Sequence, residues 1–496
     1  MKNLSLLMIA ILMLSFIQNT GCKKTTIGSV GGSGGGGGTG TGGGSGTGGF
    51  NNSKPPVANA GPDQAITILN QYPFAILNGL GSYDSSWMTL QFAWRQIAGP
   101  TNSSIPNPGY KECTVNNINT PGVYSFELKV WNNNGSDLDT TDITVMYPSY
   151  CQPDRAEIPV SLSFLSDLPG QIQDPQIITA GNKLIIPAWF NNATSTISNN
   201  IYMYDRITQN WTTIQASLAR IGATTIAAGN KVFFAGGSYM MNNDFITTSV
   251  VDIYDITTNT WTVTNLSEAR EGCAAVVSGN KIFFAGGTKN MIEFSNKVDI
   301  YDLETNSWSS SSLPGGARIV SAAVSVMNKV LFCGGLTEFI GTVGGIDYTT
   351  PTASIDIYDN NTGQWSAATM QVSKSGFAAS NVNEKVYFAG GFVNNAATFH
   401  VEELNVNTMS SSSSCLHQPC PYGNAVIKND KIIFLGSSYY AGIAVNRFDI
   451  FNALTGEWSV GVLPPDLANN NSGRSIASVN NEVFMVIGTK LYKMNL

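Results

Sequence analysis

A repeated pair of aromatic residues constrains the fold of this 496-residue chain more than any other feature. In each pair, a Tyr or Phe is followed seven residues later by a Trp. The pairs are Tyr204 and Trp211, Tyr254 and Trp261, Tyr301 and Trp308, Tyr358 and Trp365, and Phe451 and Trp458. The first four pairs follow one another at intervals of 47 to 57 residues. A period of that length indicates one supersecondary unit that is copied and stacked along the chain.

Each copy carries a second mark ahead of its aromatic pair, a short apolar run that ends in small residues. The run is complete at residues 231–237, 281–287, 329–335 and 385–391. A small-residue stretch and a turn precede it, and the Tyr-Asp and Trp stretches follow, so each copy predicts four short strands. The array resembles the kelch repeat, whose marks are the Gly pair, the Tyr-Asp and the Trp seven residues beyond that Tyr.

The remaining copies are degenerate but stay in register. Ala188 and Trp189 occupy the Gly-pair positions of the first copy, and Gly436 begins the equivalent pair of the sixth. In the fifth copy Leu404 replaces the Tyr and Ser411 replaces the Trp. If all of these copies are real, the array contains seven units, and if the first is not, it contains six.

The last copy stops at Leu496, before its Trp strand. We expect residues 160–165 to supply that strand, because Leu168 and Pro169 follow them as a Leu-Pro pair follows other Trp strands. Such a connection closes the ring of sheets without free edges. The kelch resemblance therefore implies an all-β fold over residues 152–496, a seven-bladed β-propeller, with six blades as the alternative.

Composition argues against a nucleic-acid partner. The formal charge of -7 is spread over a chain in which only 12% of residues are charged, and no long basic run is present. Proteins that track a phosphate backbone need such a run or patch. At this length the chain is expected to hold more than one domain.

Residues 1–21 have the layout of a secretory signal, with Lys2 before an apolar stretch at 4–17 that is too short for a stable membrane span. Gly21 directly before Cys22 resembles a bacterial lipoprotein processing site. The resemblance implies lipidation of Cys22 and attachment to the outer membrane, on its periplasmic or its surface side. The alternative is an ordinary signal peptide with an incidental Cys.

Residues 22–54 form the predicted link between the anchor and the folded chain. From 28 to 49 they are almost entirely Gly with Ser and Thr, a composition that predicts a flexible coil. About twenty such residues have a root-mean-square reach of roughly 25 Å. A Gly-rich phosphate loop is not supported, because no Lys-Ser or Lys-Thr ending follows.

Residues 55–148 alternate short predicted strands with turns. The segments Pro55 to Gln64, Leu90 to Pro100 and Gly122 to Val130 resemble the PKD-like, immunoglobulin-type sandwich of bacterial surface proteins. Trp94 is the expected core aromatic of a central strand. Family members often carry an Asp-Pro-Asp-Gly turn that this chain lacks, which argues against a metal site there.

Candidate ligand-binding residues collect on one face of the predicted propeller. In an antiparallel blade, the loop after the second strand and the loop before the first emerge on the same side. The second-to-third loops are rich in aromatic residues, and the candidates are Trp189, Tyr239, Phe245, Phe339, Tyr348, Phe392, Tyr439 and Tyr440.

Four basic residues precede the first strands of their copies and are expected on that same face: Arg220, Arg270, Arg318 and Lys374. Aromatic rings beside forked donors suit a sugar or an acidic peptide. The alternative is that these side chains bond backbone carbonyls between blades. The sixth copy has Cys420 at this place.

Enzymatic chemistry has few candidate groups. The chain has two His, His400 and His417, too few for a copper radical oxidase that shares this architecture. A kelch-type sialic acid epimerase is the better enzymatic alternative, since it needs only an acid/base pair beside an Arg. The acidic candidates are Glu268, Glu271, Glu293 and Glu338.

The seven Cys divide by predicted role. Cys415 and Cys420 flank a short loop of an exported protein and are candidates for a disulfide. Cys273 and Cys333 lie within strands and are expected to be buried and reduced. Cys113 and Cys151 are a second candidate pair. No Cys/His spacing indicates zinc.

The sequence therefore predicts an exported, lipid-anchored monomer with a sandwich domain as spacer and a propeller as recognition head. The expected partners are a surface glycan or another protein, together with the membrane through the anchor. No cofactor or metal is expected. The alternative function is a sugar-modifying enzyme that uses the same face.

Overall fold

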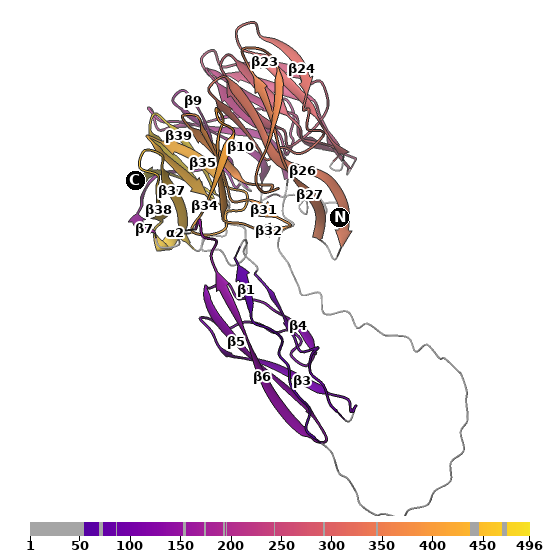
Figure 1. Cartoon of the computed structure of the whole chain (residues 1–496). Helices are drawn as coiled ribbons and strands as arrows, with labels where there is room; N and C mark the ends of the chain where they lie inside the picture. Colours follow the sequence, from indigo (N-terminus) through magenta and orange to yellow (C-terminus); the bar gives the residue numbers. More distant parts are fainter. Residues whose placement is uncertain are drawn as a thin grey trace, which may run out of the picture. The chain divides into compact units, whose positions relative to one another are not determined.

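The computed structural model describes residues 54–68, 73–85, 87–151, 155–172, 175–191, 194, 196–242, 244–290, 293–343, 346–436, 446–468 and 474–496. The predicted signal segment, Cys22 and the Gly-rich link lie outside the described residues. The chain divides into two compact units between Pro148 and Ser149. Both units are built from β-strands (Figure 1).

The N-terminal unit packs a four-stranded sheet against a two-stranded one. The larger sheet has the order β1-β6-β5-β3, with β1 parallel to β6 and the other pairs antiparallel, and the smaller sheet pairs β2 with β4. The strands are β1 (Gln64–Thr67), β2 (Ala75–Asn78), β3 (Gln91–Ala98), β4 (Glu112–Val115), β5 (Gly122–Asn132) and β6 (Gly135–Met146).

Alternation along the strands builds the core of this unit. Tyr124, Phe126 and Leu128 are fully buried at every second position of β5, and Trp94 is buried beside them on β3. Gly79, at the end of β2, has no room for a Cβ because Leu128 and Trp94 pack against it. Trp94 is therefore a core residue, as the two-sheet arrangement requires.

The C-terminal unit contains seven sheets of four or five strands within the described residues. We number these sheets from first to seventh in the order in which their second strands occur along the chain. The first has β9 (Ile178–Ala180), β10 (Lys183–Asn191), β11 (Thr196–Asp205) and β12 (Trp211–Gln215). The second has β13 (Thr224–Ala228), β14 (Lys231–Ala235), β17 (Val250–Asp255) and β18 (Thr260–Asn265). The third has β19 (Ala274–Ser278), β20 (Lys281–Ala285), β23 (Lys297–Asp302) and β24 (Ser307–Ser312).

The other sheets repeat this order. The fourth has β25 (Ala322–Val326), β26 (Lys329–Val343), β27 (Ile346–Asp359) and β28 (Trp365–Thr369). The fifth has β29 (Ala378–Val382), β30 (Lys385–Ala389), β33 (His400–Asn405) and β34 (Ser410–Cys415). The sixth has β35 (Asn424–Lys428), β36 (Lys431–Leu435), β37 (Arg447–Asn452) and β38 (Glu457–Val462). The seventh has β39 (Arg474–Val479), β40 (Glu482–Ile487) and β41 (Lys490–Asn495). A four-residue helix, α2 (Pro465–Ala468), joins the last two sheets.

The first strands of consecutive sheets contact one another in a closed cycle, in which β39 of the seventh sheet returns to β9 of the first. The start of this unit completes the ring. β7 (Ala156–Pro159) pairs in parallel with β38 as a fifth strand of the sixth sheet. β8 (Ser161–Asp167) then crosses to the seventh sheet and pairs with β41. The segment where a closing strand was expected, residues 160–165, thus lies almost entirely within β8.

The repeated aromatic pair is a packing device. Tyr254 lies directly opposite Trp261 on neighbouring strands, with ring centroids 4.8 Å apart. Phe233 of the second sheet packs on Tyr301 of the third at 5.0 Å. Each Tyr therefore contacts the Trp of its own sheet and an apolar residue of the sheet before, which fastens adjacent sheets together.

Candidate binding face of the propeller

Short hairpins extend the sheets on the side where the second strand connects to the third. Three of them are separate strand pairs, and in the fourth sheet β26 and β27 simply continue as one long hairpin (Figure 1). The three pairs are β15 (Ser238–Met241) with β16 (Asp244–Thr247), β21 (Thr288–Lys289) with β22 (Glu293–Phe294), and β31 (Phe392–Val393) with β32 (Ala396–Ala397). We call this side the hairpin face.

The four basic residues predicted to bind a ligand on this face are fully buried, with no exposed side-chain surface. Three of them form ion pairs of 2.7 Å with an acid on the third strand of their own sheet. The pairs are Arg220 with Asp252, Arg270 with Asp299, and Arg318 with Asp356.

Backbone carbonyls accept further hydrogen bonds from these guanidinium groups. Arg220 donates to the carbonyl of Phe234, and its Nε and Nη1 have no hydrogen-bond partner among the described residues. Arg270 donates to the carbonyls of Gly286, Glu268 and Phe284, and Arg318 is bonded in the same way in the next sheet. Lys374 donates to the carbonyls of Phe388 and His400. Burial lowers the pKa of Lys374 to about 7.

The prediction that these four residues contact a ligand is therefore corrected. A charged group that is removed from water is costly unless it finds partners inside the protein. The three Arg have ion-pair partners, and Lys374 has two carbonyl partners. Their side chains bond within their own sheet, whereas the alternative interpretation placed such bonds between blades. Their backbones make the link between sheets, since the carbonyl of Arg270 accepts a hydrogen bond of 3.0 Å from the N–H of Gly237.

This link explains the Gly pair. Gly236 adopts a φ of 65°, and a Cβ placed on it would lie 2.2 Å from the carbonyl oxygen of Arg270. Gly286 has the same conflict with the carbonyl of Arg318. The Gly pair and the basic residue are thus two halves of one joint between neighbouring sheets.

The sixth sheet has an acid, Asp449, but no cation of its own, because Cys420 stands where the other copies have Arg or Lys. Arg155, just before β7, supplies the guanidinium group from the other end of the unit. It forms a buried ion pair with Asp449 and donates to the carbonyl of Cys415. A disulfide between Cys151 and Cys415 holds the same segment in place.

The predicted Cys415–Cys420 disulfide is therefore wrong. Cys415 is bonded to Cys151, which in turn is not available to Cys113, and Cys420 is a buried free thiol. Cys273 and Cys333 are buried and free as well. The local spacing suggested a short loop, but the bonded partner is 264 residues away in the sequence.

The predicted aromatic residues divide into two groups. Phe392 is buried, and Trp189 is partly buried against Phe234, edge to face at 5.7 Å, so both serve packing. Tyr239 and Phe245 lie on the β15–β16 hairpin with intermediate exposure, and Phe339 is exposed on β26. Tyr348 lies on β27, but its side chain is not described, and Tyr439 and Tyr440 lie outside the described residues.

Two exposed methionines join the aromatic residues of the β15–β16 hairpin. Met240 pairs across the hairpin with Phe245, and Met241, 50% exposed, lies beside the turn. Sequence reasoning missed them because it looked for aromatic residues. Two consecutive Met in a polar loop was the signal, since a hairpin outside the sheet cannot bury both.

Tyr422 is a second residue that sequence reasoning missed. It is 50% exposed, packs on Phe392 with tilted rings whose centroids lie 4.9 Å apart, and has a φ of 46°. Three other copies carry a Gly with positive φ at this position, namely Gly222, Gly272 and Gly376. A bulky residue in this backbone region is uncommon and costly. The alignment of the copies contained this signal.

The acidic candidates do not converge as an acid/base pair in the described part of the propeller. Glu268 binds Lys289 and Ser295, and Lys289 also binds Glu293. The carboxylate of Glu271 accepts a 2.6 Å bond from Ser238 of the preceding sheet, and burial raises its pKa.

The remaining titratable candidates are also structural. Burial lowers the pKa of His400 to about 3, so it is neutral near pH 7. The backbone N–H of His417 donates to Asp449. Within the described ranges, no group of three His, Cys, Asp or Glu residues is placed to hold a metal ion. No helix in that part of the chain is long and apolar enough to cross a membrane.

Comparison with known proteins supports both halves of this architecture. A family model for the KLHDC2/KLHL20/DRC7 Kelch-repeats domain matches residues 166–335, and a family model for a PKD domain matches residues 60–145. The solved structure titled "Structure of YjhT" is similar over 60% of this chain and 99% of that chain, with 16% identity and a TM-score of 0.45. No curated protein matches the chain. The chain is a kelch-repeat β-propeller protein with an N-terminal PKD-like domain.

Proposed function

We propose that this protein is an exported, lipid-anchored recognition protein that binds a protein ligand through the hairpin face of its propeller. The lipidated residue is Cys22, and the membrane is the outer membrane. The PKD-like domain and the Gly-rich link space the propeller from the anchor. The ligand surface consists of the β15–β16 hairpin, the extended β26–β27 hairpin and Tyr422.

The observation that supports this proposal most is the exposure of Met240 and Met241 on the separate β15–β16 hairpin and of Phe339 on the extended β26–β27 hairpin. Met side chains are flexible and polarisable, and protein-binding surfaces use them to fit irregular apolar partners. The four basic side chains expected to bind a sugar are instead buried, three of them in ion pairs. An apolar protein surface therefore fits the face better than a glycan does.

Site-specific photocrosslinking in the intact chain tests this proposal. A photoreactive amino acid at Met241 is expected to give a discrete adduct with a protein in cells that export the chain. The matched control is Leu454, an exposed apolar residue in the turn between β37 and β38, on the opposite side of the sheets. Equal adducts from both positions, or none from Met241, would count against a ligand on the hairpin face.

A sugar-modifying enzyme is the alternative, with Glu271 as the acid whose pKa is raised by burial. Incubating the full chain with a glycan panel distinguishes the two. Product formation that is lost in Glu271→Gln and kept in Met241→Ser supports the enzyme. The anchor is tested separately by incorporation of a labelled fatty acid, which Cys22→Ala should abolish, and its side of the membrane by protease digestion of whole cells.

A further inference from the structure

We propose that one end of the PKD-like domain is a membrane-contact surface, made by Val57, Tyr83, Trp87 and Met88. We call these four residues the apolar tip. The inference rests on the proposed lipid anchor, because the anchor brings this end of the domain close to a lipid surface. It adds a second, non-covalent contact with the membrane.

Strand pairing places the four residues together. The β5–β6 turn spans Asn132 to Gly135, and Pro55 packs beside Gly135. Next along the chain, Val57 forms a β-bridge with Tyr83. The loop that follows is fastened to the same turn, because Asn132 donates to Asp84 and Asn134 contacts the sulfur of Met88.

Exposure identifies this end as a contact surface. Trp87 is 95% exposed, and Val57, Tyr83 and Met88 are all exposed beside it. Trp87 has a φ of 57°, in the region that favours glycine, and its N–H donates to the carbonyl of Asp84. A bulky residue is costly in that conformation. The exposed position of the indole ring of Trp87 is therefore maintained at a cost in backbone conformational energy.

The chemistry of the tip favours lipid over a glycan. A glycan site needs polar groups beside its aromatic rings. The polar side chains here already bond one another, since Asn132 also accepts from the N–H of Asn134. What faces outward is Trp and Tyr with aliphatic Val and Met, which is the composition of membrane-interface segments.

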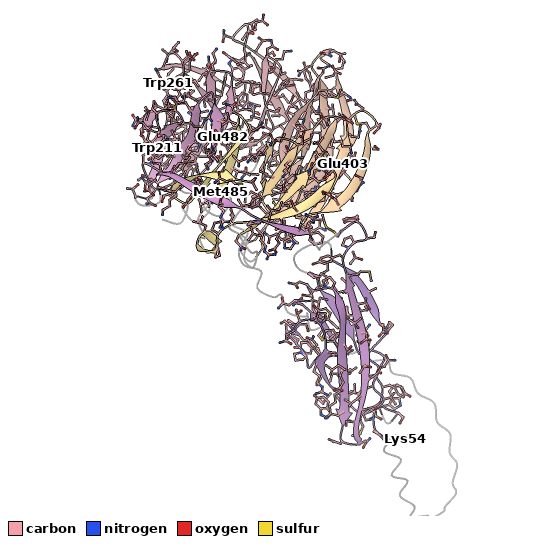
Figure 2. The ribbon with its side chains drawn as sticks, turned by 90° about the vertical axis from the view of Figure 1, so that its left-hand side faces the viewer. Lys54, Trp211, Trp261, Glu403, Glu482 and Met485 are labelled. Carbon is pink, nitrogen blue, oxygen red and sulfur yellow. A yellow bond between two sulfur atoms is a disulfide. The ribbon has the colours of Figure 1, made fainter. Side chains whose placement is uncertain are left out.

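The position of the chain supports the same partner. The structure begins at Lys54, which Figure 2 labels at this end of the domain, and Cys22 lies 32 residues earlier. A Gly-rich link of about twenty residues has a reach of roughly 25 Å. The tip is therefore the part of the domain that the link joins most directly to the membrane.

Vesicle binding tests this inference. The chain from Lys23 onward, which keeps all described residues and has no Cys22, is mixed with phosphatidylethanolamine–phosphatidylglycerol vesicles and sedimented. We expect measurable partitioning, reduced about tenfold by Trp87→Gly, which removes the burial of one aromatic side chain in lipid. Glycine relieves the positive φ, so the thermal unfolding midpoint of this variant should not fall.

The matched control is Met146→Ser. Met146 ends β6 at the opposite end of the domain, and its exposure of 42% is close to the 40% of Met88. We expect Met88→Ser to weaken partitioning and Met146→Ser to leave it unchanged. Absence of partitioning, or equal loss in both Met variants, overturns the inference.

Retention on purified cell-wall glycan that Trp87→Gly abolishes, without vesicle binding, would assign the tip to a glycan instead. Each of these outcomes is independent of fatty-acid labelling at Cys22 and of crosslinking at Met241. Failure of the tip can thus be told from failure of the proposed anchor or ligand face.

Discussion

Arg155 forms a buried ion pair with Asp449, although the two residues are 294 positions apart in the sequence. The second to fifth copies also have an acid on the third strand, and each has its own cation ten residues before the turn that joins its first and second strands. The sixth copy has Cys420 there. One guanidinium group from the start of the propeller thus completes a joint that the repeat itself leaves incomplete.

We expect Arg155→Met to lower the free energy of unfolding by about 3–5 kcal/mol, because it leaves the buried carboxylate of Asp449 without its cation. The measurement is denaturant unfolding of the full chain. A rescue variant makes the test specific: Arg155→Met with Cys420→Arg moves the cation to its usual place in the repeat. Recovery of less than half of the loss would show that Arg155 acts mainly through packing on Trp458, over which it lies at 4.6 Å.

The Cys151–Cys415 disulfide closes a loop of 264 residues. Disulfides across loops of this size stabilise by roughly 2–5 kcal/mol. We therefore expect a reductant to lower the thermal unfolding midpoint of the parent chain and to have no effect on Cys151→Ser with Cys415→Ser. Alkylation of the unfolded, unreduced chain should leave Cys420 modified. If Cys420 is protected and Cys151 is labelled, the pairing is wrong.

The buried ion pairs of the other copies are predicted to be structural. Arg270→Met should cost about 3–5 kcal/mol of unfolding free energy, since Asp299 would stay buried without its partner. The control is Lys385→Met, which breaks the partly exposed pair with Glu403 in the same propeller and should cost about 0–1 kcal/mol. If Arg270→Met is as mild as the control and loses ligand binding instead, Arg270 is a ligand contact after all.

The turns between third and fourth strands predict an acid limit to stability. Backbone N–H groups donate to the carboxylates of Asp255, Asp302 and Asp359 and hold their pKa below the usual range. The folded carboxylates bind protons less tightly than the unfolded ones, whose pKa is about 3.9. The stabilisation is therefore present above about pH 4 and is lost as the pH falls further.

Asparagine separates the hydrogen bond from the charge in these turns. Asn405 and Asn452 already accept the same pair of N–H groups in the fifth and sixth sheets. We expect the triple Asp→Asn variant at 255, 302 and 359 to be less stable than the parent near pH 7, because the neutral amide keeps the hydrogen bonds but lacks the charge that strengthens them. Below about pH 4 its stability should fall less steeply. A parallel fall in both proteins would mean that other carboxylates set the limit.

Much of the fold was predictable because it depends on local spacing. Seven residues separate Tyr254 from Trp261 because both strands of a hairpin and its turn lie between them, and the two face each other in register. That interval depends only on neighbouring residues, so it survives in every intact copy. The same reasoning located the closing strand, since an unfinished sheet leaves unpaired backbone groups at its edge.

The candidate site was predicted less well, because a basic residue in a loop has the same sequence whether it is exposed or buried. Arg270 is buried because Asp299 lies opposite it in the folded sheet. A signal was present: every copy with a basic residue there also has an acid on its apolar third strand. In the first copy, Ile172 takes the position of the basic residue and Tyr202 takes the position of the acid. Both side chains belong to one buried apolar cluster.

Local spacing was enough to predict the repeat, the four-strand unit and the order of the sheets, because these depend on residues a few positions apart. Folding of the whole ring determines which charges are buried, that Cys151 rather than Cys420 bonds Cys415, and that Arg155 completes the sixth sheet. The disulfide and the Arg155 pair join residues 264 and 294 positions apart, which meet only when the ring closes. The exposure of side chains also depends on the folded backbone. Trp87 and Tyr422 both have a positive φ, and both side chains are exposed at the surface of their domains.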